Sequence, residues 1–326
     1  MDKVACCCLQ SGALSPSYSK PSLPCTISLF PRILTNPKRA TGNNIATSPN
    51  TKRPGGFNLD FEQYMSANAK AVHEALDRAL PVRQPERLTE SVRYSVLACG
   101  KRVRPVLAIA ACELVGGSAA VATPVACAVE MVHTWSLIRY DMACMENAAL
   151  RPANHVAEGE YTALYSGVAL LALAFEHLAR GCAQLDVVPA ERALRALAEL
   201  GNAAGGVAAG MFADKASEGA PMSLDMLEYI HLHKTAALFE AAAVCGAIVG
   251  GGTNGEIESV RRYARSVGLL SQVVDDVLDQ KLLGVDEAQA YTVDLLVKAQ
   301  GELERFDAEQ AEPLHHLASF IAYGHK

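Results

Sequence analysis

This chain of 326 residues has few aromatic side chains, no excess of positive charge and no long uninterrupted apolar run. Only 6% of the residues are aromatic and 20% are charged, and the formal net charge is −6. This negative balance argues against nucleic acid as the main partner. The longest charge-free stretches, such as 114–129, are interrupted by glycine and proline. Because a membrane-spanning helix needs about 20 apolar residues in succession, the sequence predicts no transmembrane segment.

The residues that are present are divided unevenly along the chain. Residues 1–56 carry seven bases and one acid and are rich in Ser, Thr, Pro and Asn, whereas the remainder is acidic. A basic, hydroxyl-rich leader on an acidic domain is typical of an organelle transit peptide, and the Pro and Ser content favours a plastid over a mitochondrion. We therefore expect a plastid transit peptide and disordered leader over 1–56, chloroplast localisation and a folded domain over 57–326. An ordinary disordered tail is the alternative.

From residue 57 onward, helix-forming residues dominate and the alternating pattern of β-strands is absent. Segments such as 163–175 and 236–249 are apolar around most of their circumference, which predicts central positions in a bundle. The sequence therefore predicts one all-α domain. Glycine and proline clusters divide it into helices that we expect over 60–80, 86–98, 102–116, 120–141, 156–180, 190–213, 224–249, 256–280, 288–305 and 313–323.

Six of the ten cysteines follow the leader, scattered singly among apolar residues. No CxxC pair or His-x₃-His spacing accompanies them, which argues against a zinc site. We expect most of them to be buried as small hydrophobic residues in a reducing compartment. They are Cys99, Cys112, Cys127, Cys144, Cys182 and Cys245.

Three carboxylates lie close together near the end of the helix expected over 256–280. Asp275 and Asp279 are one turn apart on one face, and Asp276 lies beside them. Such carboxylates repel one another unless a cation lies between them, and Mg²⁺ accepts oxygen ligands of this kind together with substrate phosphates. Apolar neighbours place them on an otherwise buried helix, which favours a magnesium site. The alternative is a solvated acidic face.

Two groups of polar residues could bind the phosphates of such a substrate. The stretch Gly-Lys-Arg-Val-Arg-Pro supplies Lys101, Arg102 and Arg104 at the start of an expected helix. Bidentate arginine and free N–H groups at a helix start would suit a diphosphate. Lys234 and Thr235, inside an apolar helix, could hold another phosphate. For the first group, the alternative is a solvated basic turn.

Four motifs together resemble the short-chain trans-prenyltransferases, specifically the plant geranylgeranyl diphosphate synthases. They occupy 100–105, 130–133, 230–235 and 272–279, and the resemblance extends from about residue 57 to 323. It implies an isoprenoid-synthase-type helical bundle with a central cavity, in which two Asp-rich helices hold three Mg²⁺ on an allylic diphosphate. Ionisation then gives a carbocation that isopentenyl diphosphate attacks. The diphosphate-binding residues carried over by the resemblance are Lys101, Arg102, Arg104, Lys234, Thr235 and Gln272.

The first Asp-rich motif departs from the family pattern of Asp-Asp-x₄-Asp. Tyr140 replaces the leading carboxylate, Asp141 remains, and Glu146 replaces the last Asp. The stretch 150–155 lacks an Arg and a Lys that would bind diphosphate, and the loop after Asp279 is shortened. Because these groups stabilise the leaving diphosphate, their loss should raise the barrier by about 4 kcal/mol or more, a factor of about a thousand in rate. We expect no catalytic residues.

With these residues lost, the chain resembles the catalytically inactive small subunits of heteromeric geranyl(geranyl) diphosphate synthases. Those subunits carry two Cys-x₃-Cys motifs needed for partner binding, and each matching stretch here has lost its first Cys. Small residues at i and i+4 still permit close helix approach, although ordinary core positions are an equal alternative. The interface candidates are Ala108, Cys112, Ala241 and Cys245.

The sequence therefore predicts a regulatory small subunit that forms a hetero-oligomer with a plastid geranylgeranyl diphosphate synthase large subunit. Mg²⁺ would act in the complex and bind this chain weakly or not at all. One alternative is an active synthase with a reduced metal set, namely Asp141, Glu146, Asp275, Asp276 and Asp279. Another is a protein that holds prenyl diphosphates without reacting them, through Lys101, Arg104 and Lys234.

Overall fold

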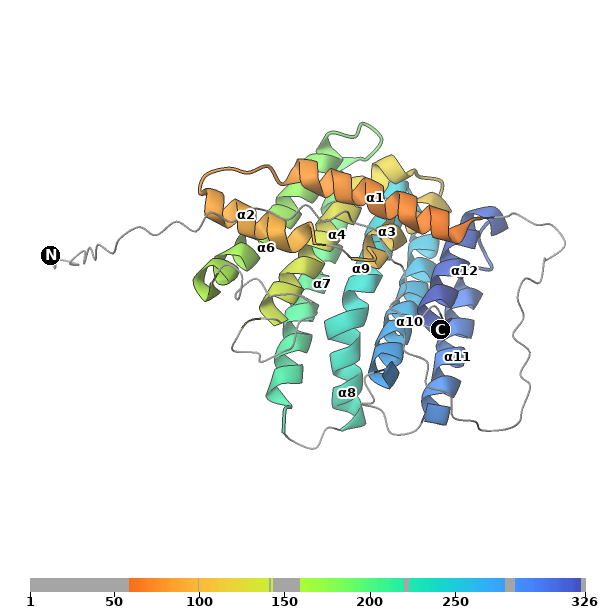
Figure 1. The fold of residues 1–326 in the computed structure, drawn as a ribbon. Coiled ribbons are helices and arrows are strands. Elements are labelled where there is room, and N and C mark those ends of the chain that lie inside the picture. The colour runs from red at the N-terminus through yellow and green to blue at the C-terminus, as the bar shows by residue number, and fades with distance from the viewer. Residues whose placement is uncertain are drawn as a thin grey trace. The chain divides into compact units, whose positions relative to one another are not determined.

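The structure is a computed structural model that describes residues 59–98, 100–140, 142, 159–219, 223–278 and 285–323. All of them belong to one compact unit, 35–326. Every regular element in these residues is helical (Figure 1), so the predicted all-α fold class is confirmed. The elements are α1 Phe61–Ala79, α2 Glu86–Val96, α3 Val103–Leu114, α4 Ala119–Tyr140, α6 Glu160–Ala183, α7 Ala190–Ala216, α8 Leu224–Ile230, the π-helix η2 His231–Ala236, α9 Ala237–Gly250, α10 Asn254–Leu278, α11 Val285–Glu302 and α12 Ala308–Tyr323.

Helix α9 forms the centre of the bundle. It packs against α3, α4, α7 and α10, while α1 crosses over α3 and α4 (Figure 1). Most of its side chains are buried, as its apolar circumference predicts. It ends at Gly251, whose φ of 98° provides the left-handed conformation that closes many helices.

Side-chain caps and prolines explain where several helices begin. Asp60 accepts a 3.0 Å hydrogen bond from the backbone N–H of Gln63 at the start of α1, and Ser223 caps α8 in the same way. Helix α12 starts at residue 308 rather than 313, because Asp307 accepts from the N–H groups of the first turn and Pro313 lies inside the helix.

Four residues predicted at a partner interface lie in the core instead. Ala108, Cys112 and Cys245 are completely buried, and Ala241 is 3% exposed. A Cβ added at Gly246 would overlap the carbonyl oxygen of Ala108, so these small residues let α3 and α9 of one chain approach closely. These four side chains therefore fill the contact between α3 and α9 within the chain, which is the core position that stood as the alternative to an interface.

The described cysteines fit the prediction of buried, small hydrophobic residues. Cys112, Cys127, Cys182 and Cys245 are buried free thiols, and burial raises the pKa of each. Thiols in such surroundings are poor nucleophiles. Cys99 and Cys144 lie outside the described residues.

Three helical spans in the described residues are long and apolar enough to cross a membrane, by length and composition only. They are Ala119–Tyr140, Glu160–Ala183 and Asp225–Gly250. The expectation that no segment reaches this length was wrong, because α4 continues through Pro124, which was taken as an interruption, although α3 does end before Gly116 and Gly117. The apolar windows of the first and third spans are 67% and 72% buried within the bundle, whereas that of α6 is only 39% buried.

Candidate active-site pocket

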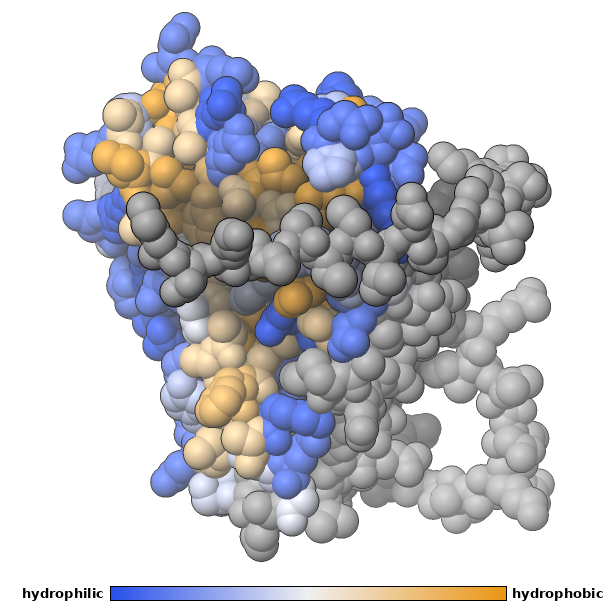
Figure 2. All heavy atoms as spheres, turned by 90° about the vertical axis from the view of Figure 1, so that its left-hand side faces the viewer, coloured by the Kyte–Doolittle hydropathy of each residue, from blue (hydrophilic) through white to orange (hydrophobic). Residues whose placement is uncertain are grey.

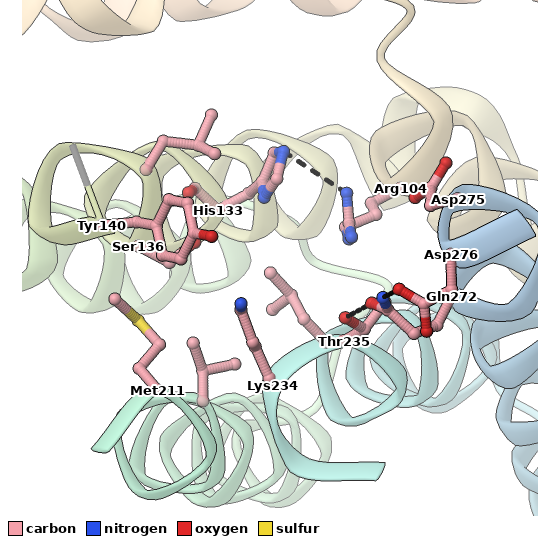
Figure 3. Close-up of a pocket in the computed structure, with 13 residues that line it drawn as sticks. Arg104, His133, Ser136, Tyr140, Met211, Lys234, Thr235, Gln272, Asp275 and Asp276 are labelled. Atoms are coloured by element: carbon pink, nitrogen blue, oxygen red, sulfur yellow. Dashed lines mark hydrogen bonds between the residues drawn. The ribbon is translucent and has the colours of Figure 1, made fainter. Parts of the chain in front are cut away.

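A cavity of about 360 Å³ opens between α4, α7, η2 and α10 (Figure 3). One part of its wall is apolar and the other carries charged and hydrogen-bonding groups. This mixed lining suits a ligand with an apolar body and a charged end. The lining residues are Arg104, His133, Ser136, Leu137, Tyr140, Val207, Met211, Lys234, Thr235, Leu238, Gln272, Asp275 and Asp276.

The π-helix η2 delivers two polar side chains to this cavity. It interrupts the helical run of 224–250 at His231–Ala236, and such short π-turns are frequent at functional sites. Gly210 of α7 allows the close approach, since a Cβ there would lie 2.8 Å from Lys234 Cα. Lys234 and Thr235 therefore project from η2 toward the pocket (Figure 3).

Lys234 contacts two other elements. Its Nζ donates a 2.6 Å hydrogen bond to Asp214 Oδ2 of α7, and the pair is one-quarter to one-third exposed. The same ammonium lies 4.3 Å from the centroid of the Tyr140 ring at the end of α4. The predicted phosphate-binding lysine is thus placed at the pocket, with a carboxylate and an aromatic face already in contact with it.

Asp276 belongs to a hydrogen-bond network that spans η2 and α10. Thr235 donates to Gln272 Oε1 at 2.6 Å, and Gln272 Nε2 donates to Asp276 Oδ1 at 2.9 Å. The other carboxylate oxygen, Oδ2, lies 3.0 Å from His231 Nε2. Asp276 is only 7% exposed, and each of its carboxylate oxygens lies next to a polar side chain. Thr235 and Gln272, two of the residues predicted to bind diphosphate, therefore line the pocket but form hydrogen bonds within the protein.

The described carboxylates do not fit a magnesium site by themselves. Asp275 is exposed and lines the pocket, whereas Asp276 Oδ1 accepts from Gln272 and Asp276 Oδ2 lies 3.0 Å from His231 Nε2. Among the described residues, no group of three or more His, Cys, Asp or Glu side chains is placed to hold a metal ion. Mg²⁺ requires several oxygen ligands or waters around it. Asp141, Glu146 and Asp279 lie outside the described residues.

Arg104 provides a second cation at the pocket wall. Its guanidinium lies 4.4 Å from the centroid of the Phe239 ring, and Nη1 lies 3.3 Å from His133 Nε2. The buried Nε atom has no hydrogen-bond partner among the described residues. Burial lowers the pKa of Arg104 to about 10, against the opposing effect of Glu130 and Asp275, so the group stays charged at neutral pH. An unpartnered buried donor of this kind favours an anionic ligand.

Two predicted diphosphate-binding residues do not line the pocket. Lys101 is exposed and lies 5.7 Å from the Phe320 ring centroid. Arg102 is 7% exposed, forms an ion pair with Glu130 and donates to the carbonyl oxygens of Val96 and Ala98. Arg102 thus supplies the charged partner that Glu130, buried in α4, requires.

Several residues that line the pocket, or that contact its lining, carried no clear signal in the sequence. His133 belongs to a resembling motif, but its place beside Arg104 depends on how α3 meets α4. Asp214 lies on α7 without any motif, and no sequence pattern marks His231 as the partner of Asp276. Their roles arise from contacts between helices that are distant in the sequence.

Comparison with known proteins identifies the family. The family model described as polyprenyl synthetase matches residues 85–288. The chain is 46% identical over 310 residues to a protein of Arabidopsis thaliana named heterodimeric geranylgeranyl pyrophosphate synthase large subunit 1, chloroplastic. The aligned region covers 86% of this chain and 83% of that protein. It is 42% identical to a chloroplastic geranylgeranyl pyrophosphate synthase of Catharanthus roseus, over 95% of this chain and 94% of the relative.

Solved structures agree with this relationship. The apo structure of a FPP/GFPP synthase from Zymomonas mobilis matches with a TM-score of 0.76 and 33% identity, over 81% of this chain and 99% of that one. A mint heterotetrameric geranyl pyrophosphate synthase, as a deletion mutant with ligands, matches with a TM-score of 0.66 and 26% identity, over 78% and 98%. The all-α bundle with its central pocket is the fold of isoprenyl diphosphate synthases, which generally use Mg²⁺. This chain belongs to the polyprenyl synthetase family.

Proposed function

We propose that this chain is a non-catalytic regulatory small subunit that binds an active plastid geranylgeranyl diphosphate synthase and raises or redirects its prenyl diphosphate output. The observation that carries the proposal is the state of the polar pocket residues. Lys234 contacts Asp214 and Tyr140, and the two oxygens of Asp276 lie against Gln272 and His231. Groups that would act on a diphosphate in an active site are here used within the chain.

The charge at the pocket explains why catalysis is not expected. Ionising an allylic diphosphate leaves a highly charged diphosphate, which must be stabilised by cations and metal ions. Tyr140 offers no carboxylate where the family motif begins, and Asp276 is already occupied. In the proposed complex, Mg²⁺ and the chemistry belong to the partner's site.

An exposed apolar face on α6 and α7 supports association with a partner. On α6, Tyr161, Tyr165 and Val168 are 75%, 50% and 60% exposed, and Phe212 of α7 is 76% exposed. Figure 2 shows apolar side chains gathered on the side of the described residues that carries these helices. Exposed apolar side chains gathered on one side in this way commonly mark a protein-binding site. The tilted contact of Tyr161 with Tyr165, at 4.8 Å between ring centroids, provides a rigid aromatic anchor.

The identity of the partner rests on the relatives. Two of them are named as large subunits of heterodimeric geranylgeranyl pyrophosphate synthases, and a matching structure is a heterotetrameric geranyl pyrophosphate synthase. We therefore choose a plastid geranylgeranyl diphosphate synthase large subunit as the partner. The basic leader over 1–56 and the chloroplastic names of several relatives support a plastid location.

A second candidate function is an active short-chain prenyl diphosphate synthase with a reduced metal set. Identities of 46–48% to several Arabidopsis geranylgeranyl pyrophosphate synthases favour it, as does the presence of Asp275 at the pocket beside the described cations. Turnover by the isolated chain separates the two proposals.

The test is a prenyltransferase assay on the full chain, alone and mixed with the Arabidopsis large subunit 1. The reaction contains Mg²⁺, isopentenyl diphosphate and dimethylallyl diphosphate, and products are resolved by chain length. We expect no turnover by the chain alone, co-elution of the two proteins and a changed rate or product ratio in the mixture. Robust turnover by the isolated chain would support the second candidate, and absence of both pairing and product change would overturn the first.

A matched pair of variants locates the partner surface. Val168 on α6 and Val297 on α11 are 60% and 62% exposed, so glutamate at either position stays solvated in the free chain. We expect Val168→Glu to abolish co-elution with the large subunit, because it buries an unpaired charge in an apolar interface. Val297→Glu should pair as the unaltered chain does. Equal pairing of both variants would remove α6 from the proposed interface.

A further inference from the structure

The ammonium of Lys234 is held between groups from two other helices. Asp214 Oδ2 on α7 lies 2.6 Å from Nζ, and the Tyr140 ring at the end of α4 lies 4.3 Å from it. We propose that Tyr140 and Asp214 form an intramolecular clamp that occupies Lys234 and thereby keeps the pocket from binding a diphosphate. Tyr140 is then an autoinhibitory residue as well as the site of a missing carboxylate.

The backbone around Lys234 fixes the geometry of this clamp. Gly210 has no side chain, and η2 lies so close to α7 at this point that a Cβ there would meet Lys234 Cα at 2.8 Å. Asp214 is one turn beyond Gly210 on the same helix, so its carboxylate lies within reach of the lysine. Figure 3 shows Lys234 pointing into the pocket from η2, with Tyr140 on the α4 side. The close packing of α7 and η2 holds the lysine in this place.

The two contacts act on charge in different ways. Asp214 neutralises Lys234 through a charge-assisted hydrogen bond. The Tyr140 ring covers the ammonium with its negative face, an attraction that strengthens as water is excluded. A phosphorylated ligand therefore competes with both contacts for Lys234. Of the cations that line the pocket in the described residues, Arg104 alone then remains for the anion.

The clamp deepens the proposed function and rests on it, because an idle pocket is useful only in a subunit that does no chemistry. It also makes a separate statement about the isolated chain. Diphosphate binding is measured without the partner and without metal, so its outcome does not depend on pairing or turnover. A failure of the clamp therefore leaves the pairing test untouched, and a failure of pairing leaves the clamp testable.

The experiment titrates inorganic diphosphate into the full chain by isothermal calorimetry, with a chelator present to exclude divalent metal. We expect Tyr140→Ala and Asp214→Asn each to bind at least tenfold more tightly than the unaltered chain. Tyr140→Phe keeps the aromatic face and should bind as weakly as the unaltered chain. Adding Lys234→Met to Tyr140→Ala should remove the gain, which a purely structural effect of the ring would not do.

Two results would overturn the proposal. One is equal affinity of the unaltered chain, Tyr140→Ala and Asp214→Asn. The other is a gain that persists after Lys234→Met, which would mean that the enlarged cavity binds diphosphate through other groups. Circular dichroism and thermal unfolding of every variant establish that it is folded. If Tyr140→Ala does not fold, Asp214→Asn with and without Lys234→Met provides the same comparison, because Asp214 is one-third exposed.

Discussion

The close packing of α3 against α9 predicts that Gly246→Ala destabilises the protein, although alanine is the better helix former. A Cβ at this position overlaps the carbonyl oxygen of Ala108 and lies 3.0 Å and 3.2 Å from its carbonyl carbon and Cα. Real Cβ atoms essentially never come as close to another atom as this Cβ would come to the oxygen, so α3 and α9 must move apart by roughly 1 Å. The obstacle is backbone in the centre of the core, which cannot rotate away.

The magnitude follows from two opposing effects. Overpacking of a well-packed core costs about 1–3 kcal/mol, and the upper end applies where backbone is displaced. Replacing glycine by alanine within a helix returns about 1 kcal/mol. We therefore expect a net loss of about 2 kcal/mol in the free energy of unfolding.

Gly205→Ala is the matched control for this change. Gly205 also lies inside a helix, α7, but no atom lies within 4 Å of an added Cβ. Only the helix propensity then applies, and the variant should gain about 0.5–1 kcal/mol. Urea unfolding, monitored by far-ultraviolet circular dichroism, measures the stability of both variants. The slope of the unfolding free energy against urea concentration should stay constant. A Gly246→Ala protein as stable as the unaltered chain would refute the close packing of α3 on α9.

Two further stability predictions concern buried ionisable groups, the Arg102–Glu130 ion pair and His133. Arg102→Met should cost about 3–5 kcal/mol, because it leaves Glu130 buried without its partner, whereas Arg180→Met removes an exposed pair with Glu176 and should cost about 0.5 kcal/mol or less in the same urea assay. Burial, aided by Arg104, lowers the pKa of His133 well below its usual value of about 6.5, so the folded chain keeps this histidine neutral. The unfolded chain binds a proton there as pH falls, so this stability is present above about pH 6.5 and is lost below it. His133→Gln should flatten the decline of stability between about pH 7 and 5, and an unchanged slope would contradict the buried setting of the ring.

The fold class could be predicted because helical periodicity and punctuation are local properties. The apolar circumference of 236–249 predicted the central position of α9, and most expected helix bounds agree with the structure to within a few residues. The π-turn at His231–Ala236 was not predicted, because no local signal in the sequence marks it; in the structure η2 passes close to Gly210 of α7. From the sequence, the small residues Ala108 and Cys245 indicated a close approach of two helices, but not whether these helices belong to one chain or to two. In the structure both residues are buried within the chain.

The sequence by itself determined which residue types are available for chemistry, and it placed Lys234, Thr235, Gln272 and Asp275 at one pocket. Only the tertiary structure decided what those groups do. Arg102 serves Glu130 in the core, Lys101 lies at the surface over an aromatic ring, and Asp214 reaches Lys234 from a helix without any motif. The physical reason is that hydrogen bonds and ion pairs form between side chains brought together by helix packing, and a linear pattern does not specify which distant partner each charge will meet.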